Sequence, residues 1–157
     1  MQQQIEIIRK TRAAFIYLCK NLTMEQMNNI PEGFNNYIIW NFGHIIVTQQ
    51  GLCYGLAGVP LKVEKSLTAK YKKGTKPEGI VSEAEYLELQ ALSVSLINEF
   101  EKDYEAELFT QYSPYMTSLN VELDSIEKAT AFNAFHEGLH FGAMLALKNL
   151  AKQQFPR

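Results

Sequence analysis

The sequence predicts an all-α protein, a four-helix bundle with long crossover connections. Four segments of about 20 residues carry apolar residues at helical spacings of three and four. Strand-like alternation does not compete in these segments, and only the stretch 115–123 reads briefly as extended. Four such helices can bury one another around a shared core, so we expect one domain over residues 1–157.

The first two helices are predicted at residues 3–22 and 35–57. In the first, Ile5, Ile8 and Phe15 fall on one face, which is typical of a helix half-buried against its neighbours. The second is apolar nearly all round, as a helix at the centre of a bundle would be.

The third and fourth helices have recognisable starts. Ser82 is followed three residues later by Glu85, a capping-box pattern, and the apolar stripe continues to Leu108. The fourth helix covers residues 124–152, with Glu127 in its first turn, where an acidic side chain favours the helix dipole. The connections 58–81 and 109–123 are long, so sequential helices can run parallel.

Charge and hydropathy exclude several classes of protein. The 15 basic and 17 acidic residues give a net charge of −2, which does not indicate nucleic-acid binding. The most apolar region, 37–59, is interrupted by polar residues, so we expect no membrane span. The N-terminus lacks the apolar stretch of a secretory signal, so the expected location is cytoplasmic. Cys19 and Cys53 lie in apolar helical stretches and are expected to be buried thiols.

HEGLH, at positions 136–140, has the H-E-x-x-H form found in zinc metalloproteases. His136 and His140 are one helical turn apart, so both rings can reach one ion. After His140 the chain reads FGAMLALKNLAKQQFPR, with no His, Asp or Glu to supply the downstream third ligand of common zinc peptidases. His44, inside the second predicted helix, is the remaining histidine. If the second and fourth helices are neighbours, all three histidines can converge.

Other residues near the histidines leave alternatives open. Glu137 is a candidate general base or support for a ligand, or else a surface or interface charge. Asn41 and Asn133, each three residues before a histidine, either orient a ligand or make ordinary buried contacts. Two further groups are noted: glycines that permit close approach of helices (Gly43, Gly138, Gly142) and residues that could line a pocket mouth (Tyr112, Tyr115, Thr117).

Two stretches carry a resemblance to a known family. IIWNFGHI (38–45) and FHEGLHFGAML (135–145) resemble the second-helix and fourth-helix motifs of the DinB/YfiT-like superfamily of metal-binding four-helix bundles. The resemblance implies a divalent metal, typically zinc or nickel, held by His44, His136 and His140, and frequent homodimers. Some members have Arg after the last histidine; Phe141 stands here, so any role of that arginine does not transfer.

The resemblance also implies a chemistry. Characterised relatives include S-transferases that use low-molecular-weight thiols, and a maleylpyruvate isomerase. Our leading hypothesis is transfer of such a thiol to a small electrophile at the three-histidine site. The alternatives are a metal-dependent hydrolase that uses metal-bound water, or a non-catalytic dimeric bundle that binds a metal or ligand. The lysine-rich loop 62–76 is either a solvated loop or a means of attracting anionic substrates.

Overall fold

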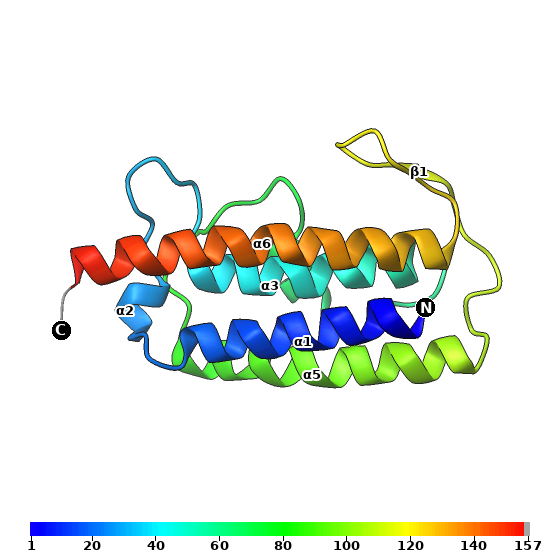
Figure 1. Cartoon of the computed structure of the whole chain (residues 1–157), viewed down its shortest axis with the longest axis horizontal. Helices are drawn as coiled ribbons and strands as arrows, with labels where there is room; N and C mark the ends of the chain where they lie inside the picture. Colours follow the sequence, from blue (N-terminus) through cyan, green and yellow to red (C-terminus); the bar gives the residue numbers. More distant parts are fainter. Residues whose placement is uncertain (156–157) are drawn as a thin grey trace.

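Four long helices surround a shared apolar core in the structure, a computed structural model that describes residues 1–155 (Figure 1). They are α1 (Gln2–Cys19), α3 (Ile38–Gln49), α5 (Glu83–Glu105) and α6 (Ile126–Gln154). The predicted all-α bundle is confirmed. Residues 156 and 157, which the expected domain includes, lie outside the described part.

Each long helix packs against two others. One side of the bundle is formed by α6 between α1 and α3, and the other by α5 between the same two helices. Figure 1 shows α1 and α6 running in one direction and α3 and α5 in the other. The consecutive helices α3 and α5 are therefore parallel, which the long connection between them permits.

The central position of α3 explains its sequence. It contacts α4, α5 and α6, so nearly every side chain from Ile38 to Val47 is buried. By contrast, α1 buries a stripe that includes Ile5, Ile8 and Phe15, and it leaves its other face exposed. The sequence predicted that this helix, apolar on nearly every face, lies at the centre of the bundle, and α3 does.

The first helix ends at Cys19 rather than at residue 22, because a second, short helix begins close behind it. Helix α2 (Met24–Met27) is capped at Thr23, whose hydroxyl accepts from the Gln26 backbone N–H at 3.1 Å. The Gln26 side chain accepts from the Thr23 backbone N–H at 2.9 Å in return. This capping box is visible in the sequence but lies outside the predicted helices.

Helix α3 continues into a π-helical segment, η1 (Gln50–Gly55). The predicted helix 35–57 therefore begins three residues later than expected and changes its hydrogen-bond pattern after Gln49. Gln50 is buried, and its Oε1 accepts from the Lys62 backbone N–H at 2.8 Å. This bond ties the following connection back to the bundle.

The connection 58–81 is not only a loop, since it contains helix α4 (Lys65–Tyr71). The ring of Tyr71 packs against Gly43, where an added Cβ would lie 2.6 Å from Tyr71 Cδ1. The expectation that Gly43 permits a close approach is confirmed. The same expectation is wrong for Gly138 and Gly142, which face open space.

A small hairpin precedes α6. Strand β1 (Tyr115–Met116) pairs antiparallel with β2 (Glu122–Leu123), within the stretch that reads as extended in the sequence. Helix α5 ends at Glu105, before the predicted Leu108, because Glu107 adopts a left-handed backbone with φ of 55°. Cys19 and Cys53 are buried free thiols, as expected. Within residues 1–155, no helix combines the length and apolar character needed to cross a membrane.

Candidate metal centre

The three histidines meet between α3 and α6. The centroid of the His44 ring lies 5.2 Å from that of His136 and 4.8 Å from that of His140. The two rings on α6 are 4.5 Å apart. Each ring offers one nitrogen, and these atoms lie within 4.8 Å of one another, a geometry compatible with a metal site. The convergence expected from the sequence is therefore present.

His44 is held by the backbone of another helix. Its Nδ1 lies 2.7 Å from the carbonyl oxygen of Tyr71, which can only accept, so Nδ1 carries the proton. The lone pair is then on Nε2, available to a ligand. The Trp40 ring stacks on the imidazole at 4.9 Å between centroids and 10° between planes. The Thr48 hydroxyl lies 3.3 Å from Nε2.

His140 is held by Asn41. The distance from its Nδ1 to Asn41 Oδ1 is 2.8 Å. The Asn41 amide nitrogen donates to Asn36 Oδ1 at 2.8 Å and to the Tyr37 carbonyl at 2.9 Å, so its oxygen is left to face the imidazole. Asn41 therefore contacts a histidine through its oxygen, and its role in orienting a metal ligand stays a prediction. That histidine lies on the opposite helix rather than one turn along α3.

His136 differs from the other two. Its Nδ1 is buried and has no hydrogen-bond partner within residues 1–155. A buried polar atom without a partner costs free energy, which a bound metal ion or an ordered water at this nitrogen would offset. The Phe132 ring lies nearly parallel to the imidazole, with 6.5 Å between centroids.

Burial keeps the three rings neutral. Desolvation is the largest influence on each ring and lowers the pKa of His44, that of His136 to about 3 and that of His140 to about 4. Neighbouring histidines lower the last two further. Neutral imidazole is the form that binds a metal, and three such donors suit zinc, nickel and related ions. The residues therefore fit the metal that the family resemblance implies.

A cavity of about 260 Å³ opens beside His44 and His136. Its walls come from α3, η1, α6, the hairpin and the segment after α4 (Thr48, Leu52, Phe132, Tyr115, Thr117, Ser118, Lys73). Of the three residues that the sequence suggested for a pocket mouth, Tyr115 and Thr117 line this cavity. The third, Tyr112, instead donates its hydroxyl to the Leu52 carbonyl at 2.9 Å.

Glu137 belongs to a separate buried network. Its carboxylate accepts from Arg12 Nη2 at 2.8 Å and from Asn133 Nδ2 at 2.9 Å. Arg12 also donates to the Ser93 carbonyl at 3.2 Å. Glu137 is fully buried, so the surface-charge alternative is wrong. It is not among the residues that line the cavity, and Asn133 contacts Glu137 rather than a histidine.

Sequence reasoning missed Arg12, although the sequence holds a signal for it. Arg12 continues the 5, 8, 12, 15 spacing of the apolar face of α1, and it is 1% exposed. A charged residue at a core position needs a buried partner, and Glu137 supplies one.

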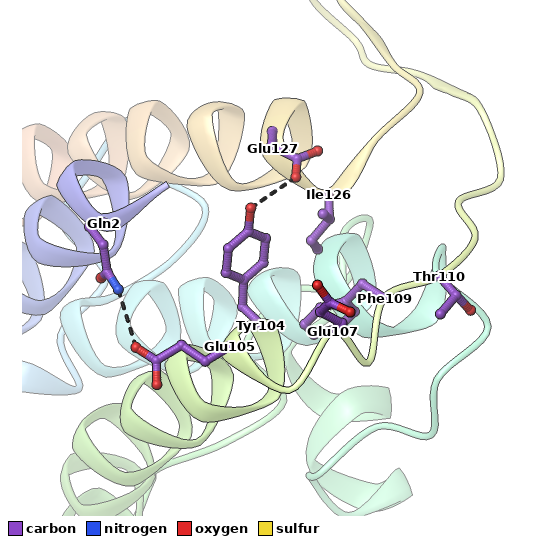
Figure 2. Close-up of a pocket in the computed structure, with 8 residues that line it drawn as sticks. All are labelled: Gln2, Tyr104, Glu105, Glu107, Phe109, Thr110, Ile126 and Glu127. Carbon is purple, nitrogen blue, oxygen red and sulfur yellow. Dashed lines mark hydrogen bonds between the residues drawn. The ribbon is translucent and has the colours of Figure 1, made fainter.

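A second cavity, of about 430 Å³, lies where α5 ends and α6 begins (Figure 2). Its side chains bond to one another: Gln2 donates to Glu105 at 3.3 Å and Tyr104 donates to Glu127 at 3.1 Å. The lining residues include no histidine, cysteine or lysine, and we assign no role to this cavity.

The comparisons with known proteins agree with the geometry. No curated protein matches the chain. The family model described as the DinB superfamily matches residues 7–144, a span that contains His44, His136 and His140. Since the match covers most of the sequence, the chain belongs to the DinB superfamily.

Proposed function

We propose that the protein is a metal-dependent enzyme that transfers a low-molecular-weight thiol to a small electrophile. The observation that supports this most directly is a set of three neutral imidazoles beside an open cavity. Three protein ligands leave a coordination position for a substrate, as catalytic sites do and structural sites do not. His44, His136 and His140 would hold the ion, and zinc and nickel are the candidates.

A divalent ion held there would supply Lewis acidity, which would lower the pKa of a thiol bound to it. The protein orients two rings through Tyr71 and Asn41, and it packs Trp40 against His44 and Phe132 beside His136. In the transfer, the thiol gives its proton to solvent and its sulfur bonds to the electrophilic carbon. The leaving group departs with the electron pair of the broken bond.

The hydrolase alternative has less support. Coordination to a divalent ion would lower the pKa of water as it would that of a thiol, so a base assists hydrolysis without being essential, and Glu137 was the candidate base. Its carboxylate is taken up by Arg12 and Asn133, and no carboxylate lines the cavity beside the histidines. Thiol transfer depends less on a base, because a free thiol has a pKa of about 8.5 and water one of about 15.7, so a coordinated thiol would lose its proton more readily.

The test begins with metal content. Untagged protein purified without a nickel column should carry a stoichiometric divalent metal, measured by mass spectrometry of the elements. His44→Ala and His140→Ala should lose it, whereas Ser66→Ala, at an exposed helical position, should retain it. Full metal retention in both histidine variants would overturn the site.

Activity is then measured with a panel of thiols and a chromogenic electrophile. At least one thiol should accelerate product formation in the wild type and not in His44→Ala. If water alone supports turnover, the protein is a hydrolase. If the metal binds and neither reaction occurs, the non-catalytic bundle is the better description.

We also propose that the protein forms a homodimer through the outer face of α6. The exposed positions of α6 from 131 to 149 carry no charge, and Phe135, Leu139 and Leu145 are 50%, 52% and 42% exposed. An isologous pair of these faces would bury the apolar side chains against their own copies.

The test of the dimer is the mass in solution. Sedimentation should give twice the 17.9 kDa of one chain for the wild type. Leu139→Lys should be monomeric, and Leu87→Lys, at a similarly exposed position on α5, should remain dimeric. A monomeric wild type would rule the dimer out.

A further inference from the structure

Among the lysines of the 62–76 segment that form no ion pair within residues 1–155, Lys73 alone lines the cavity beside the histidines. Lys62 forms ion pairs with Glu99 and Asp103, and Lys70 lies 2.7 Å from Glu85. Lys73 has no ion pair or hydrogen bond within the described part of the chain, and it lines the cavity beside the histidines.

The position of Lys73 is fixed by the residues around it. Tyr71, two residues earlier, is buried against Gly43 and binds His44 through its carbonyl. On the other side, Gly74 turns the chain with φ of 88°, and the Thr75 hydroxyl donates to the Lys72 carbonyl at 2.8 Å. The backbone at Lys73 is therefore anchored to the metal centre, while its side chain is free to bind a ligand.

The other cavity residues suit an anion. Four hydroxyl groups line the cavity (Thr48, Tyr115, Thr117, Ser118), and none of its lining residues is acidic. An ammonium group without a counter-ion, together with hydroxyl donors, favours a ligand that carries negative charge. At about 260 Å³, the cavity is smaller than the ~300–1,000 Å³ of typical ligand pockets, so only a small ligand fits it.

We infer that the substrate at this site is a small thiol that carries a carboxylate, and that Lys73 binds the carboxylate. The inference rests on the proposed function, because it assigns the other end of the same substrate to the three histidines. Lys73 then selects among thiols, since a neutral thiol of equal size leaves the ammonium group unpaired.

The test uses cobalt(II)-loaded protein, in which thiol binding is followed by visible absorption and, independently, by calorimetry. The probes are 3-mercaptopropionate and its neutral amide, which differ in charge and hardly in size. The wild type should bind the acid about two- to fivefold more tightly than the amide, the effect of one ion pair at an exposed lysine. This preference should shrink as ionic strength rises.

The variants separate charge from structure. Lys73→Met should bind both probes equally, and Lys73→Arg should restore most of the preference for the acid. Lys76→Met, in the same connection but outside the cavity lining, should behave as the wild type.

The two ideas fail in different ways. If the wild type binds acid and amide equally, or if Lys73→Met keeps the preference, the inference about Lys73 is overturned and the thiol site survives. If cobalt does not bind, or neither probe alters the cobalt spectrum, the proposed function fails and the inference with it.

Discussion

At the scale of single residues, the histidines depend on two oxygen atoms that hold them in place. The Tyr71 carbonyl and Asn41 Oδ1 each accept a hydrogen bond from an Nδ1–H, and so direct the opposite nitrogen of each ring toward the centre. Removal of such an acceptor leaves the ligand in place but frees its ring to rotate or to change tautomer.

Asn41→Leu should lower metal affinity about 10- to 100-fold, because His140 loses the acceptor that orients it. Asn41→Asp, which keeps an oxygen at that position, should lose much less. A competition titration against a chromophoric chelator measures both, with circular dichroism to confirm the fold. Equal affinity in wild type and Asn41→Leu would show that the contact does not orient the ligand.

Glu137→Gln should destabilise the fold by about 3–5 kcal/mol, because it leaves the buried Arg12 charge uncompensated. Urea unfolding measures the loss. Metal binding by the folded protein should be unchanged, since Glu137 contacts Arg12 and Asn133 and no histidine. A loss of metal with no loss of stability would instead place Glu137 in the metal centre.

These residues show what sequence spacing can reveal. The pair His136 and His140, one turn apart, and the single remaining histidine predicted which rings could meet, on the condition that the helices carrying them are neighbours. The partners of Asn41 and Glu137 lie on other helices, and spacing along one helix reports only neighbours on that helix. For this reason the sequence alone left the role of Glu137 open, and its contact with Arg12 on another helix defines that role.

At the scale of elements, the short helix α4 supports the metal centre from outside the bundle. Its last residue, Tyr71, supplies the carbonyl that binds His44 and the ring that fills the space above Gly43. Helix α4 was not predicted because seven residues that include two lysines have too few apolar positions for a helical pattern.

Gly43→Ala should both destabilise the fold by about 1–3 kcal/mol and weaken metal binding, because the new methyl group displaces Tyr71. Gly51→Ala is the matched control, since its Cβ meets open space on the same continuous helix. The control should leave stability unchanged or raise it by up to about 1 kcal/mol. Chemical unfolding measures the stability of both variants, and chelator competition measures their metal affinity. Equal stability and equal metal affinity in the two variants would contradict the close contact.

At the scale of the whole molecule, the three histidines connect two helices that are distant in the sequence. His44 lies on α3 and the other two on α6, and these helices run antiparallel in contact. The bundle has a large apolar core that does not depend on this contact, so the chain should fold without metal. An ion bound only by the folded state then adds to its stability.

At a free metal concentration 100 times the dissociation constant, the free energy of unfolding should rise by about 2.7 kcal/mol. For a chain of this length, that corresponds to a rise in melting temperature of about 5–10 °C. Calorimetry with zinc and with a chelator measures it. His44→Ala should melt at the same temperature in both conditions; a metal-dependent rise in this variant would mean that the ion binds elsewhere.

The number and amphipathic character of the long helices followed from apolar spacing, but their arrangement did not. The parallel course of α3 and α5 depends on where the connection 58–81 crosses the bundle, which no local pattern encodes. The π-helical segment after Gln49 was also missed, because an α-helix and a π-helix bury similar side chains over one turn.

The place of His136 and His140 in the last helix has a consequence for biosynthesis. Translation delivers α1, α3 and α5 first, and His44 emerges long before the other two rings exist. Because domains are synthesised from the N-terminus at about 5–20 residues per second, the centre cannot be completed until α6 has left the ribosome and docked. A nascent chain that stalls in the connection 106–125 therefore has three of the four long helices and His44 without the other two rings, and the centre can acquire its metal only after α6 has been made.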